Sequence, residues 1–246
     1  MANILEEIID NKRKELQQQK KTVPVEQIKE QIKSLPKCRN FHNAITKRNK
    51  RGVNVIAEVK KASPSAGVIR KDFNAVEIAK IYESCGADAI SVLTDEKYFQ
   101  GKLEYLTQIK NAVSIPVMRK DFIVDEYQIY EARAAGADAI LLIAEAFKPN
   151  DGKIIDLMIL AGELTLTTLL EVHSAEELLR IRSLIDFPKA HYSVLGINNR
   201  DLSTMKVDLN TTIRLAELAG KTDGLVAESG IKTRQEIGRA SCRERV

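Results

Sequence analysis

The sequence predicts an α/β fold, a (β/α)8 TIM barrel, from three observations. After residue 52, short runs rich in Val, Ile and Leu alternate with segments of helical period. The runs contain few polar residues, which is typical of parallel strands buried on both faces. The segments CGADAISVLTD (85–95) and AGADAILLIAE (135–145) repeat at an offset of 50 residues, as two βα units would. No glycine-rich loop follows the first run, so the pattern favours a barrel over a doubly wound sheet.

Each element is placed from its own pattern. Residues 1–52 are predicted to form an N-terminal helical extension, with helices from Ile4 onward, over 24–33 and over 41–47. The barrel is expected over 53–235. Its predicted strands cover 53–59, 87–93, 115–118, 137–143, 166–172, 192–197 and 224–228. Predicted helices lie near 75–84, 102–111, 125–134, 151–160, 174–182 and 208–218.

Composition limits the class of protein. The chain has 246 residues, of which 44% are hydrophobic and 29% charged, as in a globular domain. The net charge of +4 is too small to indicate nucleic-acid binding, and no apolar run is long enough to cross a membrane. The three cysteines are few, odd in number and far apart, which argues against a disulfide framework. The cytoplasm is therefore the expected location. Residues 1–52 hold 13 Lys and Arg against 6 Asp and Glu, which fits a solvated extension or a cationic lid near an anionic substrate.

Polar side chains end several predicted strands, and barrels carry their chemistry at those ends. Because side chains alternate along a strand, two residues at i and i+2 of the first strand point the same way. The polar strand-end residues are Glu58, Lys60, Arg119, Lys120, Asp121, Glu171, Asn198, Arg200, Glu228 and Ser229, and Gly230 follows the last of them. A glycine after the seventh strand matches the usual phosphate position of such barrels. A single charged residue at a strand end is commonly a surface ion pair, so the predicted acid–base pocket rests on the whole set.

The histidines are interpreted differently. His173 and Ser174 fit the start of a helix, with Ser174 as N-cap and Glu177 closing a capping box. The other histidines, His42 and His191, have no partner at metal-ligand spacing. The sequence therefore predicts no metal site.

Taken together, the strand-end motifs identify a family. The sequence resembles indole-3-glycerol phosphate synthases in IAEVKKASPSAG (56–67), SVLTDEKYFQG (91–101), VMRKDFIVDEYQI (117–129), LLEVHSAEEL (169–178), LGINNRDL (195–202) and VAESGI (226–231). The resemblance covers about residues 1–235 and implies a lyase of tryptophan biosynthesis. Such an enzyme converts 1-(2-carboxyphenylamino)-1-deoxyribulose 5-phosphate to indole-3-glycerol phosphate with loss of CO2 and water. It implies a phosphorylated small-molecule substrate and no cofactor.

The resemblance also implies roles for the catalytic residues. Lys120 matches the general acid that protonates the substrate carbonyl oxygen, and Glu171 matches the general base of the dehydration. Lys60 matches the lysine that pairs with Glu58 and assists acid catalysis, and Asn198 matches the residue that orients the substrate hydroxyl and Glu171. Ser229 lies at the matching end of the seventh strand. A cationic neighbour and an apolar wall are expected to lower the pKa of the catalytic ammonium.

Substrate-binding positions follow from the same resemblance. Ser63 and Arg200 match positions that contact anionic groups, and Gly230 matches the phosphate site. Phe99, Phe122 and Leu141 are similar to the apolar wall for the anthranilate ring.

The end of the chain departs from the family pattern. Residues 236–246, EIGRASCRERV, contain no apolar run and are similar to the translation of a sequencing adapter. They are therefore interpreted as a non-native tail, which leaves the barrel truncated before its eighth strand and helix, and weakly folded. The alternatives are an inactive truncated fragment or another phosphate-binding barrel, such as a sugar-phosphate isomerase. Some relatives continue into a fused isomerase domain, and the sequence leaves such a partner open.

Overall fold

The structure is a computed structural model that describes residues 4–184, 192–201, 204–220, 224–231 and 233. Its N-terminal region forms three helices, α1 (Ile4–Thr22), α2 (Val25–Lys33) and α3 (Phe41–Thr46). All three were predicted, with ends that differ by a residue or so. Among the described residues, no helix is both long and apolar enough to cross a membrane.

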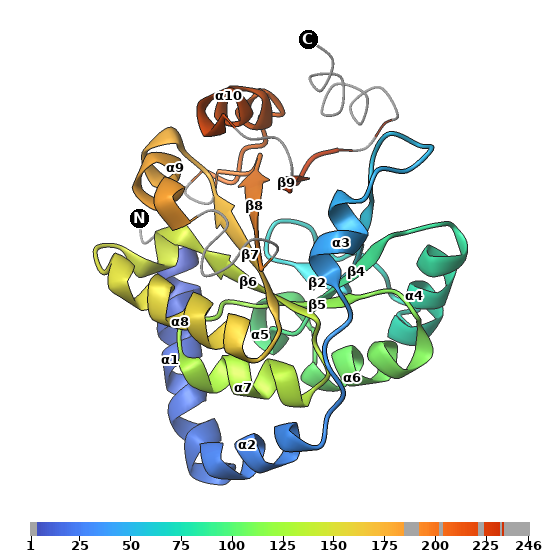
Figure 1. Cartoon of the computed structure of the whole chain (residues 1–246), viewed down its shortest axis with the longest axis vertical. Helices are drawn as coiled ribbons and strands as arrows, with labels where there is room; N and C mark the ends of the chain where they lie inside the picture. The colour runs from blue at the N-terminus through green and yellow to red at the C-terminus, as the bar shows by residue number, and fades with distance from the viewer. Residues whose placement is uncertain (1–3, 185–191, 202–203, 221–223, 232, 234–246) are drawn as a thin grey trace.

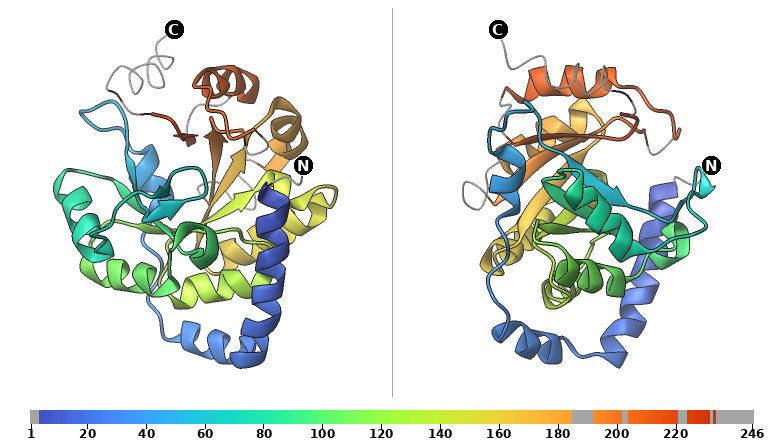
Figure 2. Two further views of the ribbon diagram at one scale, coloured as in Figure 1. Left: turned by 180° about the vertical axis from the view of Figure 1, so that it is seen from behind. Right: turned by 90° about the vertical axis from the view of Figure 1, so that its right-hand side faces the viewer.

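The strands of the main sheet are all parallel and follow one another in sequence order (Figure 1). They are β1 (Ile56–Val59), β4 (Ala89–Leu93), β5 (Val117–Lys120), β6 (Ala139–Ile143), β7 (Thr167–Val172), β8 (Ser193–Asn198) and β9 (Leu225–Glu228). The seven-stranded sheet curls with its helices on the outside, as part of a TIM barrel does (Figure 2). Every predicted strand is thereby confirmed.

The connecting helices are those predicted. They are α4 (Ala75–Ser84), α6 (Leu103–Ala112), α7 (Glu126–Ala134), α8 (Asp151–Glu163), α9 (Ala175–Ile181) and α10 (Asn210–Ala219). Shorter elements were missed, namely the hairpin of β2 (Ala62–Ser63) and β3 (Gly67–Val68), α5 (Glu96–Phe99), and the 3-10 turns η1 (Ala144–Phe147) and η2 (Arg182–Leu184). Such elements are too short to show a period in the sequence.

Both faces of the sheet are buried, which explains the continuous apolar runs. On β6, Ile140 and Leu142 pack against the outer helices, and Leu141 and Ile143 join a second cluster. That second cluster includes Leu5 and other side chains of the N-terminal helices. Strict alternation along β6 therefore divides one apolar run between two cores.

The sequence repeat has a structural counterpart at the start of β4 and β6. Gly86 and Gly136 both follow a helix with positive φ, at 88° and 93°, where glycine has no Cβ penalty. Two residues later, Asp88 Oδ2 accepts the backbone N–H of Val55 at 2.8 Å, and Asp138 Oδ2 accepts that of Val117 at 2.9 Å. In each repeat, therefore, the glycine ends a helix and the aspartate binds the backbone at the start of the preceding strand.

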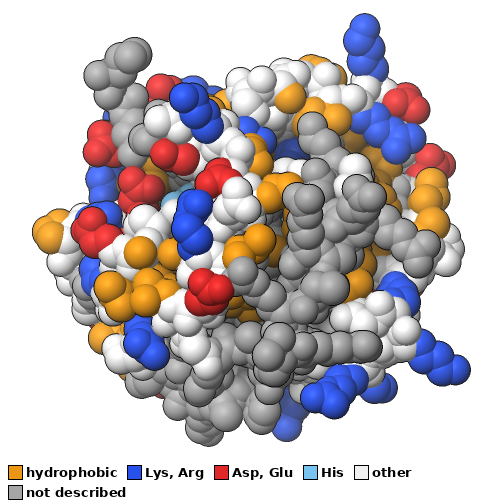
Figure 3. Space-filling model, turned by 90° about the horizontal axis from the view of Figure 1, so that it is seen from above, with side chains coloured by type: hydrophobic (Ala, Val, Ile, Leu, Met, Phe, Trp, Pro, Cys, Tyr) orange, Lys and Arg blue, Asp and Glu red, His pale blue; other side chains and the backbone are white. Residues whose placement is uncertain are grey.

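The chain ends outside the described residues. The predicted non-native tail over 236–246 falls there, so this interpretation stays a prediction. On the face seen from above, acidic and basic side chains of the described part are spread among apolar ones (Figure 3).

Candidate active site

One cavity at the carboxyl ends of the strands brings together every predicted site residue. Its lining includes the predicted catalytic residues Glu58, Lys60, Lys120, Glu171, Asn198 and Ser229. It also includes the predicted substrate-binding residues Ser63, Phe99, Phe122, Leu141, Arg200 and Gly230. The fold thus brings these residues together in one cavity, although this placement by itself assigns no role to any of them.

A lysine between two buried glutamates forms the centre of the cavity. Lys120 ends β5, and its Nζ lies 2.5 Å from Glu228 Oε2 at the end of β9. The same Nζ lies 3.5 Å from Glu171 Oε2 on β7. Three separate strands therefore hold these groups. Opposite charges attract one another more strongly inside a protein than in water.

The electrostatics of this centre correct the expected pKa of the lysine. Burial lowers the pKa of Lys120, but the carboxylates of Glu228 and Glu171 outweigh burial and hold it well above its ordinary value. The prediction of a lowered pKa was wrong because the neighbouring groups are anionic, not cationic. Burial and the nearby Glu171 carboxylate raise the pKa of Glu228 to about 7.

Glu171 is held from several sides. Asn198 Nδ2 donates to Glu171 Oε1 at 3.0 Å, so the predicted orienting role has a direct contact behind it. His173 Nε2 lies 3.1 Å from the same oxygen. Burial raises the pKa of Glu171, but Lys120, His173 and Asn198 outweigh burial and hold it well below its usual range. The carboxylate is therefore ionised and fixed in orientation.

A second charged pair lies at the end of β1. Lys60 Nζ donates to Glu58 Oε1, and both side chains are partly exposed to the cavity. Strand alternation places them on the same side, as predicted. The pair gives the cavity a further proton donor beside its central lysine.

An apolar wall lies beside the charged groups. The rings of Phe99 and Phe122 are 6.0 Å apart between centroids, and their planes make an angle of 37°. Leu141 on β6 is buried and lines the same cavity. A flat aromatic group would find van der Waals partners here.

The backbone after β9 turns sharply. Ser229 and Gly230 have positive φ values of 65° and 80°. A Cβ at Gly230 would meet Val207 Cγ1 at 2.3 Å, so only glycine fits. Such consecutive turn residues expose backbone N–H groups, as anion sites do.

The two other predicted anion contacts are held by local bonds. Ser63 Oγ accepts the N–H of Ala66 at 3.2 Å within the β2–β3 hairpin. Arg200 Nη1 donates to the carbonyl of Met205 at 3.1 Å, and the Arg200 N–H donates to Asn198 Oδ1 at 3.0 Å. Both side chains are therefore oriented while lining the cavity.

Sequence reasoning gave no role in the site to three of its residues. Glu228 was placed among the polar strand-end residues, but no individual role was predicted for it. Ser91 lies in the middle of an apolar run, and its buried Oγ has no hydrogen-bond partner among the described residues. His173 was interpreted as part of a helix start, yet its ring contacts Glu171.

The helix start itself was predicted correctly. Ser174 caps α9 and accepts the N–H of Glu177 at 3.2 Å. Glu177 Oε2 accepts the N–H of His173 at 2.9 Å, one residue before the position that a standard capping box uses. Among the described residues, one group could hold a metal ion, formed by Glu145, His173 and Glu177 with ligand atoms within 4.8 Å of one another.

Parallel strands that present an ammonium, two buried carboxylates and an aromatic wall in one cavity define an enzyme that works by side-chain acids and bases. The comparisons narrow this class. The family model described as indole-3-glycerol phosphate synthase matches residues 5–244. The chain belongs to the indole-3-glycerol phosphate synthase family, and it is a ring-closing, decarboxylating lyase of tryptophan biosynthesis.

Curated relatives with that name span nearly the whole chain. The protein from Rhodopirellula baltica is 44% identical over 234 residues, which cover 95% of this chain and 86% of the relative. That from Clostridium acetobutylicum is 45% identical, with 95% and 85% covered. That from Neisseria gonorrhoeae is 46% identical, with 96% and 88% covered. The family decides against the alternative of a different phosphate-binding barrel.

Proposed function

We propose that Lys120 and Glu171 carry the ring closure of 1-(2-carboxyphenylamino)-1-deoxyribulose 5-phosphate in this cavity, as general acid and general base. The observation that supports this most is the position of one ammonium between two buried carboxylates from different strands. A cation there can donate a proton to an oxygen, and a fixed carboxylate beside it can accept one later.

The chemistry sets what each group does. The aromatic carbon that carries the carboxylate attacks the substrate carbonyl carbon, and Lys120 gives a proton to the carbonyl oxygen, which becomes a hydroxyl. Loss of CO2 returns an electron pair to the ring. The hydroxyl then takes a second proton, from the Lys60 ammonium, and leaves as water, and Glu171 accepts the proton released from carbon as the new five-membered ring becomes aromatic. Lys60, paired with Glu58, assists the acid step.

Because its pKa is raised, Lys120 can act as an acid only if its surroundings change when the substrate binds. In the free site the ammonium is stabilised by Glu228 and Glu171, so it is a poor acid. A substrate carbonyl that separates the ammonium from Glu228 removes part of that stabilisation. Because the pKa of Glu228 is raised to about 7, this carboxylate can be neutralised near neutral pH, which makes Lys120 more acidic.

The remaining residues bind and orient the substrate. Gly230 and the N–H groups beside it hold the phosphate, and Ser229 holds the turn. Asn198 orients Glu171 through its 3.0 Å hydrogen bond. Arg200 and Ser63 contact anionic oxygens of the substrate. Phe99, Phe122 and Leu141 form the wall for the anthranilate ring.

The first prediction concerns Lys120→Ala. Loss of a general acid typically costs 10²–10⁴ in rate, so we expect kcat to fall by roughly that factor. Binding of the product indole-3-glycerol phosphate, measured by calorimetry, should change little. Lys80→Ala, on the exposed surface, is the matched control and should keep full turnover. Near-normal turnover of Lys120→Ala would overturn the assigned role.

Three wider expectations belong to the same proposal. They are a cytoplasmic location, a functional association with an isomerase domain, and a barrel domain over 53–235.

A further inference from the structure

A buried histidine lies behind the proposed general base and outside the roles described so far. His173 follows β7, two residues after Glu171, and only 6% of its side chain is exposed. Its Nε2 lies 3.1 Å from Glu171 Oε1, and its Nδ1 lies 3.5 Å from Glu177 Oε2. The ring is thus placed between two carboxylates, each almost fully buried.

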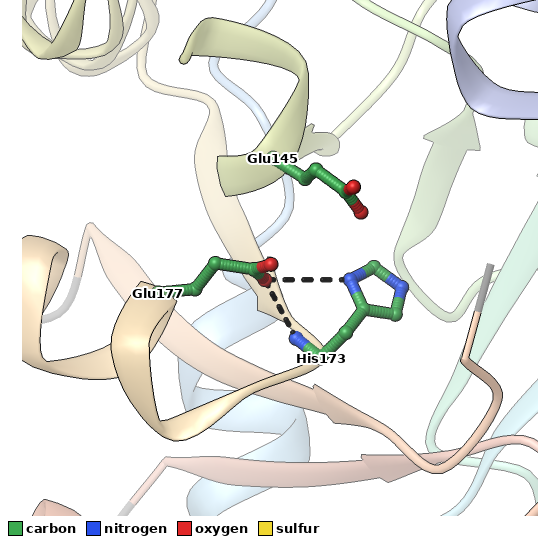
Figure 4. A group of neighbouring side chains, drawn as sticks. All are labelled: Glu145, His173 and Glu177. Carbon is green, nitrogen blue, oxygen red and sulfur yellow. Dashed lines mark hydrogen bonds and ion pairs between the residues drawn. The ribbon is translucent and has the colours of Figure 1, made fainter. Parts of the chain in front are cut away.

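Glu177 has a fixed position of its own. Figure 4 shows its carboxylate beside both the ring and the backbone N–H of His173. The first turn of α9 supports this arrangement, because Ser174 caps the helix at the N–H of Glu177. A carboxylate tied to the backbone therefore orients the ring, and the ring in turn faces Glu171.

The two oxygens of Glu171 have different surroundings. Oε1 accepts from Asn198 Nδ2 and lies 3.1 Å from His173 Nε2. The ring nitrogens lie beside the carboxylates as ion-pair contacts and make no hydrogen bond within the described part of the chain. Oε2 faces Lys120 Nζ at 3.5 Å and the cavity. With its contacts to Asn198 and His173 on Oε1, Glu171 presents Oε2 to the cavity.

We infer that His173 is a positioning residue, whose buried ring fixes the Glu171 carboxylate from behind and is itself oriented by Glu177. This role rests on the proposed function of Glu171. A misplacement of about 1 Å of a catalytic group can cost roughly 10²-fold in rate, so a contact at 3.1 Å on the general base matters to turnover.

The charges around the ring agree with a proton there. Glu171 on β7, Glu177 on α9 and Glu145 on η1 face His173, and Lys120 and Lys148 form ion pairs with Glu171 and Glu177. Burial lowers the pKa of His173, but the adjacent carboxylates of Glu171 and Glu177 outweigh burial and raise it to about 10. The ring therefore keeps its proton across the neutral range.

The first arm of the test needs no turnover. The chain has three histidines, so the ring of His173 can be followed by NMR of ¹³C-labelled histidine and assigned with His173→Leu. We expect it to stay protonated up to about pH 9. Glu171→Gln should lower its titration midpoint by at least one pH unit, because the closest carboxylate loses its charge. An ordinary midpoint near 6.5, or one unmoved by Glu171→Gln, overturns the inference.

The same NMR experiment distinguishes a protonated His173 ring from a metal-bound one. If micromolar Zn²⁺ shifted the His173 resonances in the wild type but not in Glu145→Gln, the cluster would be a cation site. That result would overturn the positioning role, because a metal-bound ring has exchanged its proton for the ion.

The second arm is kinetic. His173→Leu should lower kcat by roughly 10–100-fold with KM changed less than about threefold, and should move the acidic limb of the kcat profile to higher pH. His173→Gln keeps an N–H donor and should recover most of kcat. Asn74→Ala is the control for a helix start outside the cavity. It removes the cap of α4, where Asn74 Oδ1 accepts the N–H of Glu77 at 3.2 Å, and should lower the melting temperature while leaving kcat unchanged.

The outcomes separate this inference from the proposed function. Full turnover by Glu171→Gln overturns the assigned base, and the positioning role with it. An inactive Glu171→Gln combined with an unchanged kcat and pH profile in His173→Leu overturns the positioning role alone. Failure of His173→Gln to recover more turnover than His173→Leu does the same.

Discussion

At the scale of single residues, Gly196 on β8 shows how closely the site is packed. A Cβ there would lie 2.4 Å from Leu169 Cδ2 and 2.5 Å from Glu228 Oε1. Both distances are too short, so one side chain must move, and Glu228 is the partner of Lys120. We expect Gly196→Ala to lower kcat at least tenfold and to destabilise the fold by about 1–3 kcal/mol.

The control for this prediction is a glycine outside the site. Gly152 lies in α8, and its Cβ would meet only Asn150 Oδ1 at 3.3 Å. Gly152→Ala should leave kcat unchanged and alter the unfolding free energy by no more than about 1 kcal/mol, the helix-propensity difference. Steady-state kinetics and urea titration measure both variants. Equal kinetics in the two would show that Glu228 has room to move.

At the scale of elements, a buried lysine ties α1 to the barrel. Lys12 Nζ lies 2.9 Å from Asp95 Oδ2 and 3.2 Å from Asp121 Oδ1, and both carboxylates are almost fully buried. Asp121 directly follows Lys120, so the anchor of α1 lies beside the proposed acid. The interpretation of the N-terminal helices as simply solvated therefore fails at this residue.

The buried ion pairs of Lys12 predict a large loss of unfolding free energy when this one charge is removed. Removal of one partner of a buried ion pair typically costs about 3–5 kcal/mol, because the other charge stays buried without compensation. We expect a loss of that order for Lys12→Ala in urea unfolding. Lys14→Ala, on the exposed side of the same helix, should change the unfolding free energy by less than about 0.5 kcal/mol. A small loss in Lys12→Ala would mean that water reaches Asp95 and Asp121.

The longer helices and strands could be predicted from their hydrophobic patterns, whereas contacts between particular side chains could not. Apolar runs located every strand of the sheet because burial on both faces leaves few polar residues. Strand ends located the site because parallel strands end at one edge. The pKa of Lys120 was misjudged because its partners Glu228 and Glu171 are distant in sequence. The contact of His173 with Glu171 was missed because a helix start accounts equally well for the same residues.

At the scale of the whole molecule, the buried histidine makes stability depend on pH. The pKa of His173 is raised to about 10 in the fold, against about 6.5 in an unfolded chain. Its contribution to stability is therefore complete below pH 6.5 and is lost as the pH rises toward 10. Between these values the folded chain binds one proton more, so the unfolding free energy falls by about 1.4 kcal/mol per pH unit.

The useful range for this measurement is pH 7 to 8.5. The Glu228 carboxylate, whose pKa is about 7, completes its ionisation in the lower part of this range, and we expect it to do so in His173→Leu as well. Burial raises the pKa of the Cys38 thiol, so this thiol ionises first in the unfolded chain, from about pH 8.5, and that contribution is also common to both proteins. In urea titrations the unfolding free energy of the wild type should therefore fall by about 2 kcal/mol more than that of His173→Leu across this range. Equal slopes in the two proteins would mean that His173 titrates as it does in water, and its ring would then hold no proton beside Glu171 at neutral pH.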